Sequence, residues 1–327
     1  MSRPLHRGRV VVLAGGVGAA RLLRGLAPGM ARGRLTVIVN TADDDVFHGL
    51  HVSPDVDTIL YTLSGLSDPL RGWGILGDSF AALGALARYG EPTWFQLGDR
   101  DLATHLFRTE RLREGRTLTE VTALQSRALG VRARVLPMSD QPVRTIVETS
   151  GGRRSFQEYL VRDRARESVR SISYSGIRSA RPAPGVLTAI AEADAIVIAP
   201  SNPFVSVGPI LAVPGVRQAL RRAAAPVVAI SPLIGGRPVK GPADKMMRAA
   251  GLAPNPLALA EVYADVLSGL VVDTSDRACA PRLEARGIAV DHLDILMRSP
   301  VRAAAVGKAA LRLAGTLHRG RRGRLAG

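Results

Sequence analysis

The fold is decided by the stretch Val10-Val11-Val12-Leu13-Ala14-Gly15-Gly16-Val17-Gly18-Ala19-Ala20-Arg21. A short apolar run of strand length leads into a glycine turn, after which a helical pattern begins. Glycines at such a turn let backbone amides approach an anionic phosphate at the helix N-terminus. A tight turn between a strand and a helix would by itself also explain Gly15, Gly16 and Gly18. We favour phosphate binding, because the turn directly follows the first strand.

The same turn argues against a dinucleotide site. The dinucleotide fingerprint has the form G-x-G-x-x-G. Counted from Gly16, the second glycine is present as Gly18, but Arg21 stands where the third glycine is required. The sequence also offers no evident acid–base pair for hydride transfer. We therefore disfavour a nicotinamide oxidoreductase.

Apolar runs of strand length alternate with amphipathic stretches along the chain. This alternation predicts a mostly parallel sheet in a doubly wound, Rossmann-like α/β fold. The expected strands are Arg9 to Leu13, Leu35 to Asn40, Ala195 to Ala199, Pro226 to Ser231, Leu270 to Asp273 and Gly287 to His292. The expected helices are Ala19 to Leu26, Val56 to Leu66, Ser79 to Tyr89, Val216 to Ala224, Ala243 to Ala250 and Pro300 to Leu317.

The middle of the chain has a different pattern. Its extended segments are Val131 to Leu136, Thr145 to Thr149 and Arg154 to Val161. Ser150-Gly151-Gly152 joins the last two segments, as in a hairpin. Residues 98–184 also carry many arginines, and we expect them to form an inserted α+β cap over the ligand edge of the sheet. We treat residues 1–327 as one domain and residues 318–327 as a disordered basic tail.

Composition and charge restrict the class of partner. The net charge of +16 comes almost entirely from arginine, since only Lys240, Lys245 and Lys308 are lysines. Aromatic residues make up 4% of the chain and are not interleaved with the basic clusters, so we expect no nucleic-acid partner. The single cysteine, Cys279, excludes a disulfide framework and a thiolate zinc site. The basic N-terminus runs into the first strand without a signal sequence, and no apolar run approaches membrane-spanning length. We expect a cytoplasmic protein.

Five carboxylates lie within fifteen residues after the second expected strand. Carboxylates so close together need a counter-ion, and Mg²⁺ bridging a diphosphate is the natural one at the carboxyl edge of such a sheet. The expected metal ligands are Asp43, Asp44 and Asp57. Asp44 and Asp57 are also the catalytic candidates, and Asn40 and Asp55 are candidates for substrate binding. Capping of the next helix would by itself explain Asp55.

Further segments supply candidates for binding or for structure. Asp99 begins a helical pattern and is expected to cap it, with Arg100 as its partner. The apolar loop after the strand Ala195 to Ala199 carries small polar groups that could hold a base or a phosphate. Those groups belong to Ser201, Asn202 and Ser206.

Two of the three lysines fall within a window of six residues. Lys240 and Lys245 stand in a chain that otherwise uses arginine. That position suggests point-charge contacts to phosphate. Two ordinary surface lysines would explain the pattern equally well.

Taken together, the motifs resemble those of the 2-phospho-L-lactate transferase (CofD) family, whose actinobacterial members are called FbiA. The resemblance runs from about Val10 to Ser299 and keeps the family's order. Its elements are LAGGVGAARLL, VNTADDD, SPDVDTILY, GDRDLATH, LPMSD, APSNPFVSVGPI and SPLIGGRPVKGPADK.

The resemblance implies a step in the biosynthesis of coenzyme F-420. In that step a phospho-acid, 2-phospholactate or phosphoenolpyruvate, passes from a guanosine diphosphate-linked donor to a deazaflavin alcohol. The hydroxyl that attacks is the ribityl 5′-hydroxyl of 7,8-didemethyl-8-hydroxy-5-deazariboflavin, and GMP is released. The resemblance further implies that Asp57 contacts the deazaflavin. Gln96 stands at a second deazaflavin position, which is often basic in the family.

Two questions stay open from the sequence. No residue decides whether the acid is lactate, enolpyruvate or glycerate, although the FbiA-like features favour enolpyruvate. The alternative function is that of a non-catalytic nucleotide-sugar regulator, like the related gluconeogenesis-factor proteins. Those proteins read D-D-G-G-S-S-G, where this chain has Asp43-Asp44-Asp45-Val46-Phe47-His48-Gly49. A homodimer is the assembly we expect.

Overall fold

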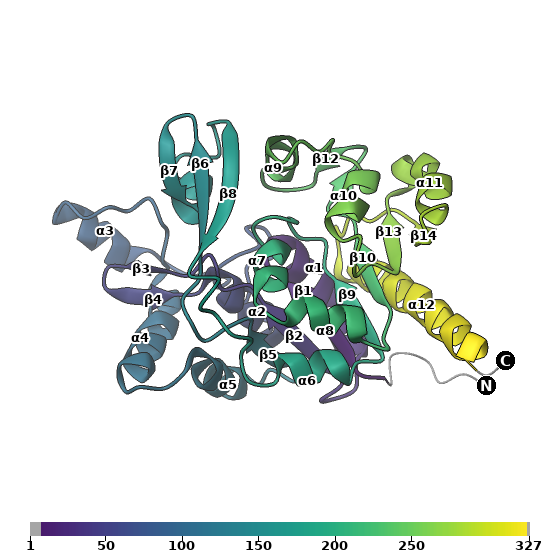
Figure 1. The fold of residues 1–327 in the computed structure, drawn as a ribbon. Coiled ribbons are helices and arrows are strands. Elements are labelled where there is room, and N and C mark those ends of the chain that lie inside the picture. Colours follow the sequence, from purple (N-terminus) through teal and green to yellow (C-terminus); the bar gives the residue numbers. More distant parts are fainter. Residues whose placement is uncertain (1–7, 326–327) are drawn as a thin grey trace.

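The computed structural model describes residues 8–325, the side chains of residues 320–325 excepted. Its centre is a seven-stranded sheet in which every pair of neighbouring strands is parallel (Figure 1). Across the sheet the strands are β14 (Ala289–His292), β13 (Gly269–Val272), β10 (Val227–Ile230), β9 (Ala195–Ile198), β1 (Val10–Ala14), β2 (Leu35–Val39) and β5 (Arg134–Pro137). All six strands expected from the sequence are present. The basic N-terminal residues 1–7 lie outside the described residues.

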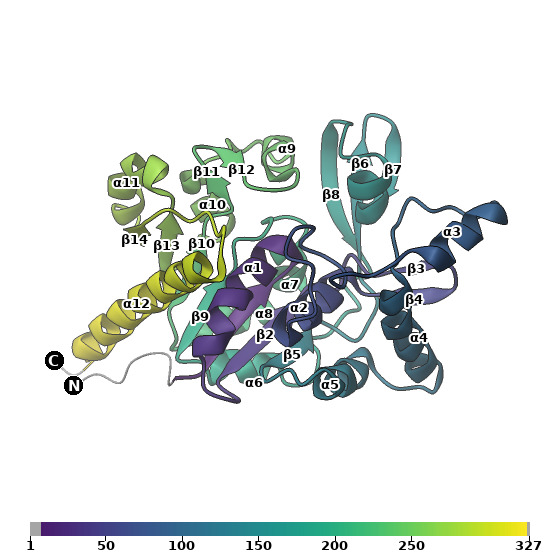
Figure 2. The ribbon, with the colours of Figure 1, turned by 180° about the vertical axis from the view of Figure 1, so that it is seen from behind.

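Helices cover both faces of the sheet, so the doubly wound α/β fold is confirmed. One face carries α1 (Gly16–Leu26), α2 (Pro54–Ser64) and α12 (Pro300–Leu325), which are in front in Figure 2. The other face carries α6 (Val186–Ala191), α7 (Val207–Ala212), α8 (Val216–Arg222), α10 (Pro256–Val262) and α11 (Ala280–Glu284). Near the β5 side lie α3 (Ala81–Arg88), α4 (Asp99–Arg113) and α5 (Leu118–Ala128). Short turns of 3-10 helix are η2 (Ala27–Gly29) and η4 (Thr274–Cys279).

The two-sided packing explains why these strands are apolar throughout. Successive side chains of a strand point to opposite faces. In β1, Val10 and Val12 pack with α1 and α12, whereas Val11 and Leu13 pack with the helices of the opposite face. A strand buried on both faces needs a continuous apolar run, which is the pattern the sequence has.

The order of the strands fixes where a ligand binds. From β1 the chain builds β2 and β5 on one side, and β9, β10, β13 and β14 on the other. The sheet therefore has its topological switch point between β1 and β9. In open α/β sheets, ligands bind outside the carboxyl ends of the strands at this point. The glycine turn after β1 and the loop after β9 meet there.

A small antiparallel sheet stands over the carboxyl edge (Figure 1). It contains β6 (Arg144–Thr149), β7 (Gly152–Ser155) and β8 (Val169–Ser175). The expected hairpin is confirmed, since β6 and β7 pair antiparallel on either side of Ser150 and Gly151. The expected extended segment Arg154 to Val161 is wrong beyond Ser155, because Glu158–Arg162 form a π-helical turn, η3. Two further hairpins pair β3 (Asp45–Phe47) with β4 (Leu50–Val52) and β11 (Leu233–Ile234) with β12 (Arg237–Pro238).

Two expected boundaries differ from the structure. Residues 98–184 do not form a separate insertion, because β5 within them pairs with β2 and forms the edge of the central sheet. The helix α12 continues to Leu325, through most of the segment 318–327 that we expected to be disordered. Residues 326–327 lie outside the described part. Within residues 8–325, no helix combines the length and apolarity that crossing a bilayer requires.

Candidate functional site

A cavity of about 610 Å³ lies at the switch point. Its walls come from the turn before α1, the start of α2, the loop after β9, the π-helical turn η3 and the start of α9 (Ala243–Ala249). Most residues expected at the site line this cavity: Gly15, Gly16, Gly18, Asp43, Asp55, Asp57, Gln96, Ser201, Asn202, Ser206 and Lys240. The expected residues that do not line it are Asn40, Asp44 and Lys245.

The glycine turn is required by packing as well as by any ligand. Gly16 has a φ of +68°, a conformation that residues with a side chain rarely adopt. A Cβ atom on Gly18 would lie 2.1 Å from the carbonyl oxygen of Pro200. The amide of Gly16 donates to Asp55 Oδ1 at 2.7 Å, so a protein carboxylate already occupies this donor. A phosphate at the turn therefore has to use the next amides of the first turn, which have no acceptor within the helix.

Asn40 joins two carboxylates behind the glycine turn. Its Nδ2 donates to Asp43 Oδ2 at 3.1 Å, to Asp55 Oδ2 at 2.9 Å and to the carbonyl oxygen of Val205 at 3.2 Å. Burial raises the pKa of Asp43 well above its usual value, and the charge of Asp55 adds to the effect. Burial also raises the pKa of Asp55, to about 6, against the opposing hydrogen bonds from Asn40 and Gly16. A cation beside this pair would favour both charged forms.

The geometry fits Mg²⁺ at two carboxylates instead of three. Among residues 8–325, no group of three or more His, Cys, Asp or Glu side chains is arranged to hold a metal. Mg²⁺ in phosphate-transfer sites is commonly held by one or two carboxylates together with water and substrate phosphates. Asp43 and Asp55 both line the cavity, and Asp43 Oδ1 is buried without a hydrogen-bond partner. These two side chains could hold the ion; the expected set with Asp44 and Asp57 is not assembled.

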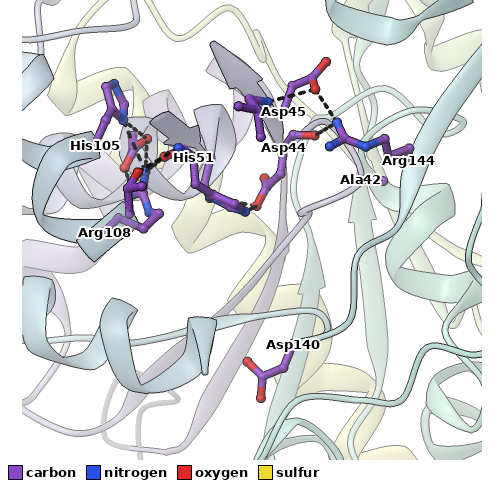
Figure 3. Close-up of polar contacts among 12 residues, drawn as sticks. Ala42, Asp44, Asp45, His51, His105, Arg108, Asp140 and Arg144 are labelled. Atoms are coloured by element: carbon purple, nitrogen blue, oxygen red, sulfur yellow. Dashed lines mark hydrogen bonds and ion pairs between the residues drawn. The ribbon is translucent and has the colours of Figure 1, made fainter. Parts of the chain in front are cut away.

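Asp44 lies behind the wall of the cavity, contrary to the metal-binding and catalytic roles that we expected. Its Oδ2 accepts a hydrogen bond from Ser53 Oγ at 2.7 Å. His51 Nε2 lies 4.0 Å away, but burial, with the charges of Arg108 and Arg144, lowers the pKa of His51 to about 4. His51 is therefore neutral near pH 7 and does not balance the carboxylate. The main-chain carbonyl of Asp44 accepts from Arg144, as Figure 3 shows.

Asp57 lines the cavity, but its carboxylate is paired with a buried arginine. Arg108 is fully buried, and its two terminal nitrogens donate to the two carboxylate oxygens of Asp57. His105 lies next to Arg108 (Figure 3), with Nδ1 3.3 Å from Arg108 Nη1. Both carboxylate oxygens of Asp57 therefore already accept hydrogen bonds from the protein. This pairing differs from the unpaired catalytic carboxylate that we expected.

The sequence analysis missed Arg108 and His105. The signal was present, because Asp101, His105 and Arg108 follow at helical spacing and therefore share one face of α4. We had considered only a cap by Asp99 with Arg100 as its partner. That expectation was wrong: the Asp99 carboxylate accepts from the amides of Ala81 and Ala82 and caps the neighbouring helix α3.

The loop after β9 uses part of its polar groups to hold its own shape. Ser201 Oγ donates to the carbonyl oxygen of Gly15 at 2.7 Å. Asn202 Oδ1 accepts from the amide of Phe204 at 2.9 Å, and its Nδ2 lies 3.1 Å from Met246 Sδ. Both residues therefore line the cavity mainly as structural supports of the loop.

The two lysines have different positions. Lys240 lines the cavity, and its Nζ donates to the carbonyl oxygen of Arg71 at 3.1 Å. Burial and then the charge of Arg21 lower its pKa. Lys245, expected to bind substrate, instead donates to the carbonyl oxygens of Ala165 and Arg166, outside the cavity. Only Lys240 is placed to meet a phosphate.

Aromatic side chains also line the cavity, which the sequence analysis did not predict. Trp94 and Phe95 lie next to each other, with ring centroids 5.8 Å apart, and Trp73 and Phe156 also belong to the lining. Phe47 stacks on Phe95 from behind, with ring centroids 3.9 Å apart. Aromatic residues make up only 4% of the chain, and these rings come together only in the folded structure. Such a wall suits a flat, conjugated ring.

Comparison with known proteins fits this geometry. The sequence matches the family of 2-phospho-L-lactate transferase CofD over residues 10–303. Similar proteins include a phosphoenolpyruvate transferase of Streptomyces griseus, 46% identical over 94% of this chain and 98% of that protein. A 2-phospho-L-lactate transferase of Methanosarcina mazei is 40% identical over 89% of this chain and 95% of that protein.

A solved structure is similar in fold. It is a Bacillus halodurans protein of the UPF0052 family, 22% identical, with a TM-score of 0.64 over 93% of this chain and 99% of that one. The relatives named as transferases, in contrast, are 40–46% identical to this chain. They favour a transferase over the non-catalytic regulator and the oxidoreductase that we had weighed as alternatives. The chain belongs to the 2-phospho-L-lactate transferase CofD family and is a transferase.

Proposed function

We propose that this chain transfers a phospho-acid from a guanosine diphosphate-linked donor to the ribityl 5′-hydroxyl of 7,8-didemethyl-8-hydroxy-5-deazariboflavin, with release of GMP. The reaction would be a step in the biosynthesis of coenzyme F-420. The observation that carries the proposal is a cavity lined by groups suited to a diphosphate and by aromatic rings. Its lining includes a glycine turn, two carboxylates and the cationic Arg21 and Lys240, which we call the cationic end. It also includes the adjacent rings of Trp94 and Phe95, which we call the aromatic end.

The end near the glycine turn suits the diphosphate of the donor. Arg21 and Lys240 both line it, and their positive charges are close enough to lower the pKa of Lys240. The first-turn amides of α1 add donors and the positive end of the helix dipole. Asp43 and Asp55 would hold Mg²⁺ together with the phosphate oxygens. When bound, the ion would offset the negative charge that two carboxylates and a diphosphate bring into one site.

The aromatic end suits the deazaflavin ring. Trp94 and Phe95 precede Gln96, which also lines the cavity. A tricyclic ring can stack on such side chains, while Gln96 offers an amide donor and acceptor to the polar edge of the ring. The ribityl chain would then run from this end toward Asp57 and bring its terminal hydroxyl to the phosphorus.

The proposed reaction is an in-line displacement at phosphorus. The 5′-hydroxyl oxygen forms a bond to the phosphorus that carries the acid, and the bond from that phosphorus to the bridging oxygen of GMP breaks. The hydroxyl proton is released, the bonding electrons leave with GMP, and no group is oxidised or reduced. Positioning and charge neutralisation are the main contributions that a protein makes to such a transfer. Arg21, Lys240 and the amides of the turn supply these contributions from the chain itself.

Relatives named phosphoenolpyruvate transferase reach 46% identity, against 40% for the relative named 2-phospho-L-lactate transferase. We therefore propose phosphoenolpyruvate as the preferred acid. The cytoplasmic location and the homodimer stay predictions.

The test is a transfer assay with purified protein, the deazaflavin, Mg²⁺ and one guanylated acid at a time. Mass spectrometry should find the deazaflavin phosphodiester and GMP in equal amounts, with the largest yield from the enolpyruvyl donor. The negative control is Asp43→Asn, which keeps the size of the side chain but removes the charge of a proposed metal ligand. This variant should form little or no product. If the wild-type protein forms no phosphodiester from any guanylated acid, the proposal is wrong.

A further inference from the structure

One wall of the cavity carries two carboxylates, those of Asp57 and Asp101. Asp57 and Tyr61 of α2 line it, together with Asp101 and His105 of α4. The Tyr61 hydroxyl donates to Asp101 Oδ1 at 2.5 Å, and His105 Nε2 lies 3.2 Å from the same oxygen. The donors of this wall are thus directed at Asp101, and the carboxylate oxygens are left to meet a ligand.

The contacts of Arg108 set the direction of the polar contacts behind this wall. An arginine side chain has donors and no acceptor. His105 Nδ1 lies 3.3 Å from Arg108 Nη1 and is therefore placed to accept, whereas Nε2 lies 3.2 Å from Asp101 Oδ1 and is placed to donate. Burial alone would raise the pKa of Asp101, but the hydrogen bonds from His105 and Tyr61 keep it below the usual value.

Arg108 itself is held from several sides although it does not reach the cavity. Besides the two bonds to Asp57, Nη1 lies 3.4 Å from the carbonyl oxygen of His51 and Nη2 lies 3.4 Å from Gln125 Oε1. Gln125 is in turn fixed through the carbonyl oxygen of Thr104 at 3.2 Å. The planar guanidinium therefore sets the plane of the Asp57 carboxylate, which a point charge such as lysine would not do.

From this geometry we infer that Arg108 and His105 are positioning residues that orient Asp57 and Asp101 as a pair of acceptors for the hydroxyl-bearing substrate. Within residues 8–325, the hydrogen bonds of Asp101 leave Oδ2 unused, so this oxygen can accept from a ligand hydroxyl. Carboxylates bind hydroxyl groups and repel phosphate. The wall therefore selects the uncharged polyol and directs the donor diphosphate to the cationic end near Arg21 and Lys240. This inference rests on the proposed function, because it takes the ribityl chain as the polyol.

The test compares two ligands in variants of one helix. Arg108→Lys keeps the charge but loses the planar pair of donors, and His105→Phe removes the donor to Asp101. The matched control is Arg113→Met, an exposed arginine on the same helix. Binding of the deazaflavin would be measured by fluorescence titration and binding of GDP by calorimetry, in full-length protein whose urea midpoint is checked.

We expect both variants to bind the deazaflavin about tenfold more weakly or worse, with GDP affinity within about twofold of wild type. In the transfer assay, the KM for the deazaflavin should rise and the KM for the donor should not. His105→Gln keeps a side-chain donor and should recover part of the loss. Equal weakening for both ligands would mark a purely structural role and overturn the inference, as would unchanged deazaflavin binding. If the wild-type protein does not bind the deazaflavin, the proposed function fails as well.

Discussion

The buried carboxylate of Asp55 predicts an unusual dependence of stability on pH in the metal-free protein. Its pKa is raised from 3.8 to about 6, chiefly by burial. The folded state therefore holds the proton more tightly than the unfolded chain does. The contribution of protonated Asp55 to the free energy of unfolding is fully present below pH 3.8 and is lost as the pH rises through about 6. Asp55 thus destabilises the metal-free fold at neutral pH, opposite to the effect of an ion-paired carboxylate.

The variant Asp55→Asn isolates this effect. With these two pKa values, linkage gives a penalty of about 1.6 kcal/mol at about pH 5 and about 3 kcal/mol at about pH 7.5. The unfolding free energy of the variant, relative to wild type, should therefore increase by about 1.4 kcal/mol between these pH values. An asparagine Oδ1 can still accept from Gly16, and the altered contact with Asn40 gives an offset that does not change with pH. Removing the Asp55 charge also removes the repulsion that helps to raise the pKa of Asp43. This change increases the unfolding free energy of the variant at higher pH as well.

The assay is urea unfolding with EDTA at both pH values, followed by tryptophan fluorescence. Asp99→Asn is the control, because Asp99 is only partly buried, its pKa is lowered by hydrogen bonds from Ser79 and the α3 amides, and asparagine also caps helices. That control should show no such increase. If wild type and Asp55→Asn differ in unfolding free energy by the same amount at both pH values, Asp55 titrates as in the unfolded chain. The buried pair is then not as we describe. Saturating GDP and Mg²⁺ should stabilise the wild type more than the variant.

Three further predictions follow from single contacts. Gly18→Ala places a Cβ atom 2.1 Å from the backbone of Pro200, so we expect a loss of about 3 kcal/mol or more in urea unfolding; an unchanged midpoint would contradict the packing of the turn. Asp57→Asn leaves the fully buried Arg108 without its counter-charge and should lower the free energy of unfolding by about 3–5 kcal/mol. The double variant Asp57→Asn with Arg108→Met should lose less unfolding free energy than the two single variants together. Strict additivity in this double-mutant cycle would refute the pairing. Lys245→Met should destabilise the fold by about 1 kcal/mol without weakening GDP binding, whereas Lys240→Met should weaken GDP binding. If calorimetry finds the reverse, Lys245 is the phosphate contact and Lys240 the structural lysine.

A loss of product in an Asp57 variant could come from the deazaflavin contact or from the loss of the Arg108 pair. Transfer rates of such a variant should therefore be compared with its urea midpoint. The double variant with Arg108→Met separates the two causes, because it removes the unpaired charge but does not restore the contact to the substrate.

Local pattern was sufficient for much of the fold. The strands of the central sheet are continuous apolar runs, and burial on both faces requires that pattern regardless of which strands are neighbours. The hairpin at Ser150 and Gly151 was also readable, because a glycine turn between two extended runs is a local signal. Val131 to Leu136 was recognised as extended, but its place as the sheet edge was not, since pairing with β2 is a contact between distant segments.

The candidate site divides in the same way. The sequence by itself determined that a glycine turn, a group of carboxylates, a polar loop and a lysine gather at the carboxyl edge, because parallel strands end on one side of a sheet. Only the tertiary structure decided which carboxylates face the ligand. Asp55 meets Gly16 across 39 positions, and Asp57 meets Arg108 across 51. Neighbouring side chains in a loop or first helical turn point in different directions, and the partners that fix those directions come from elements that only folding brings together.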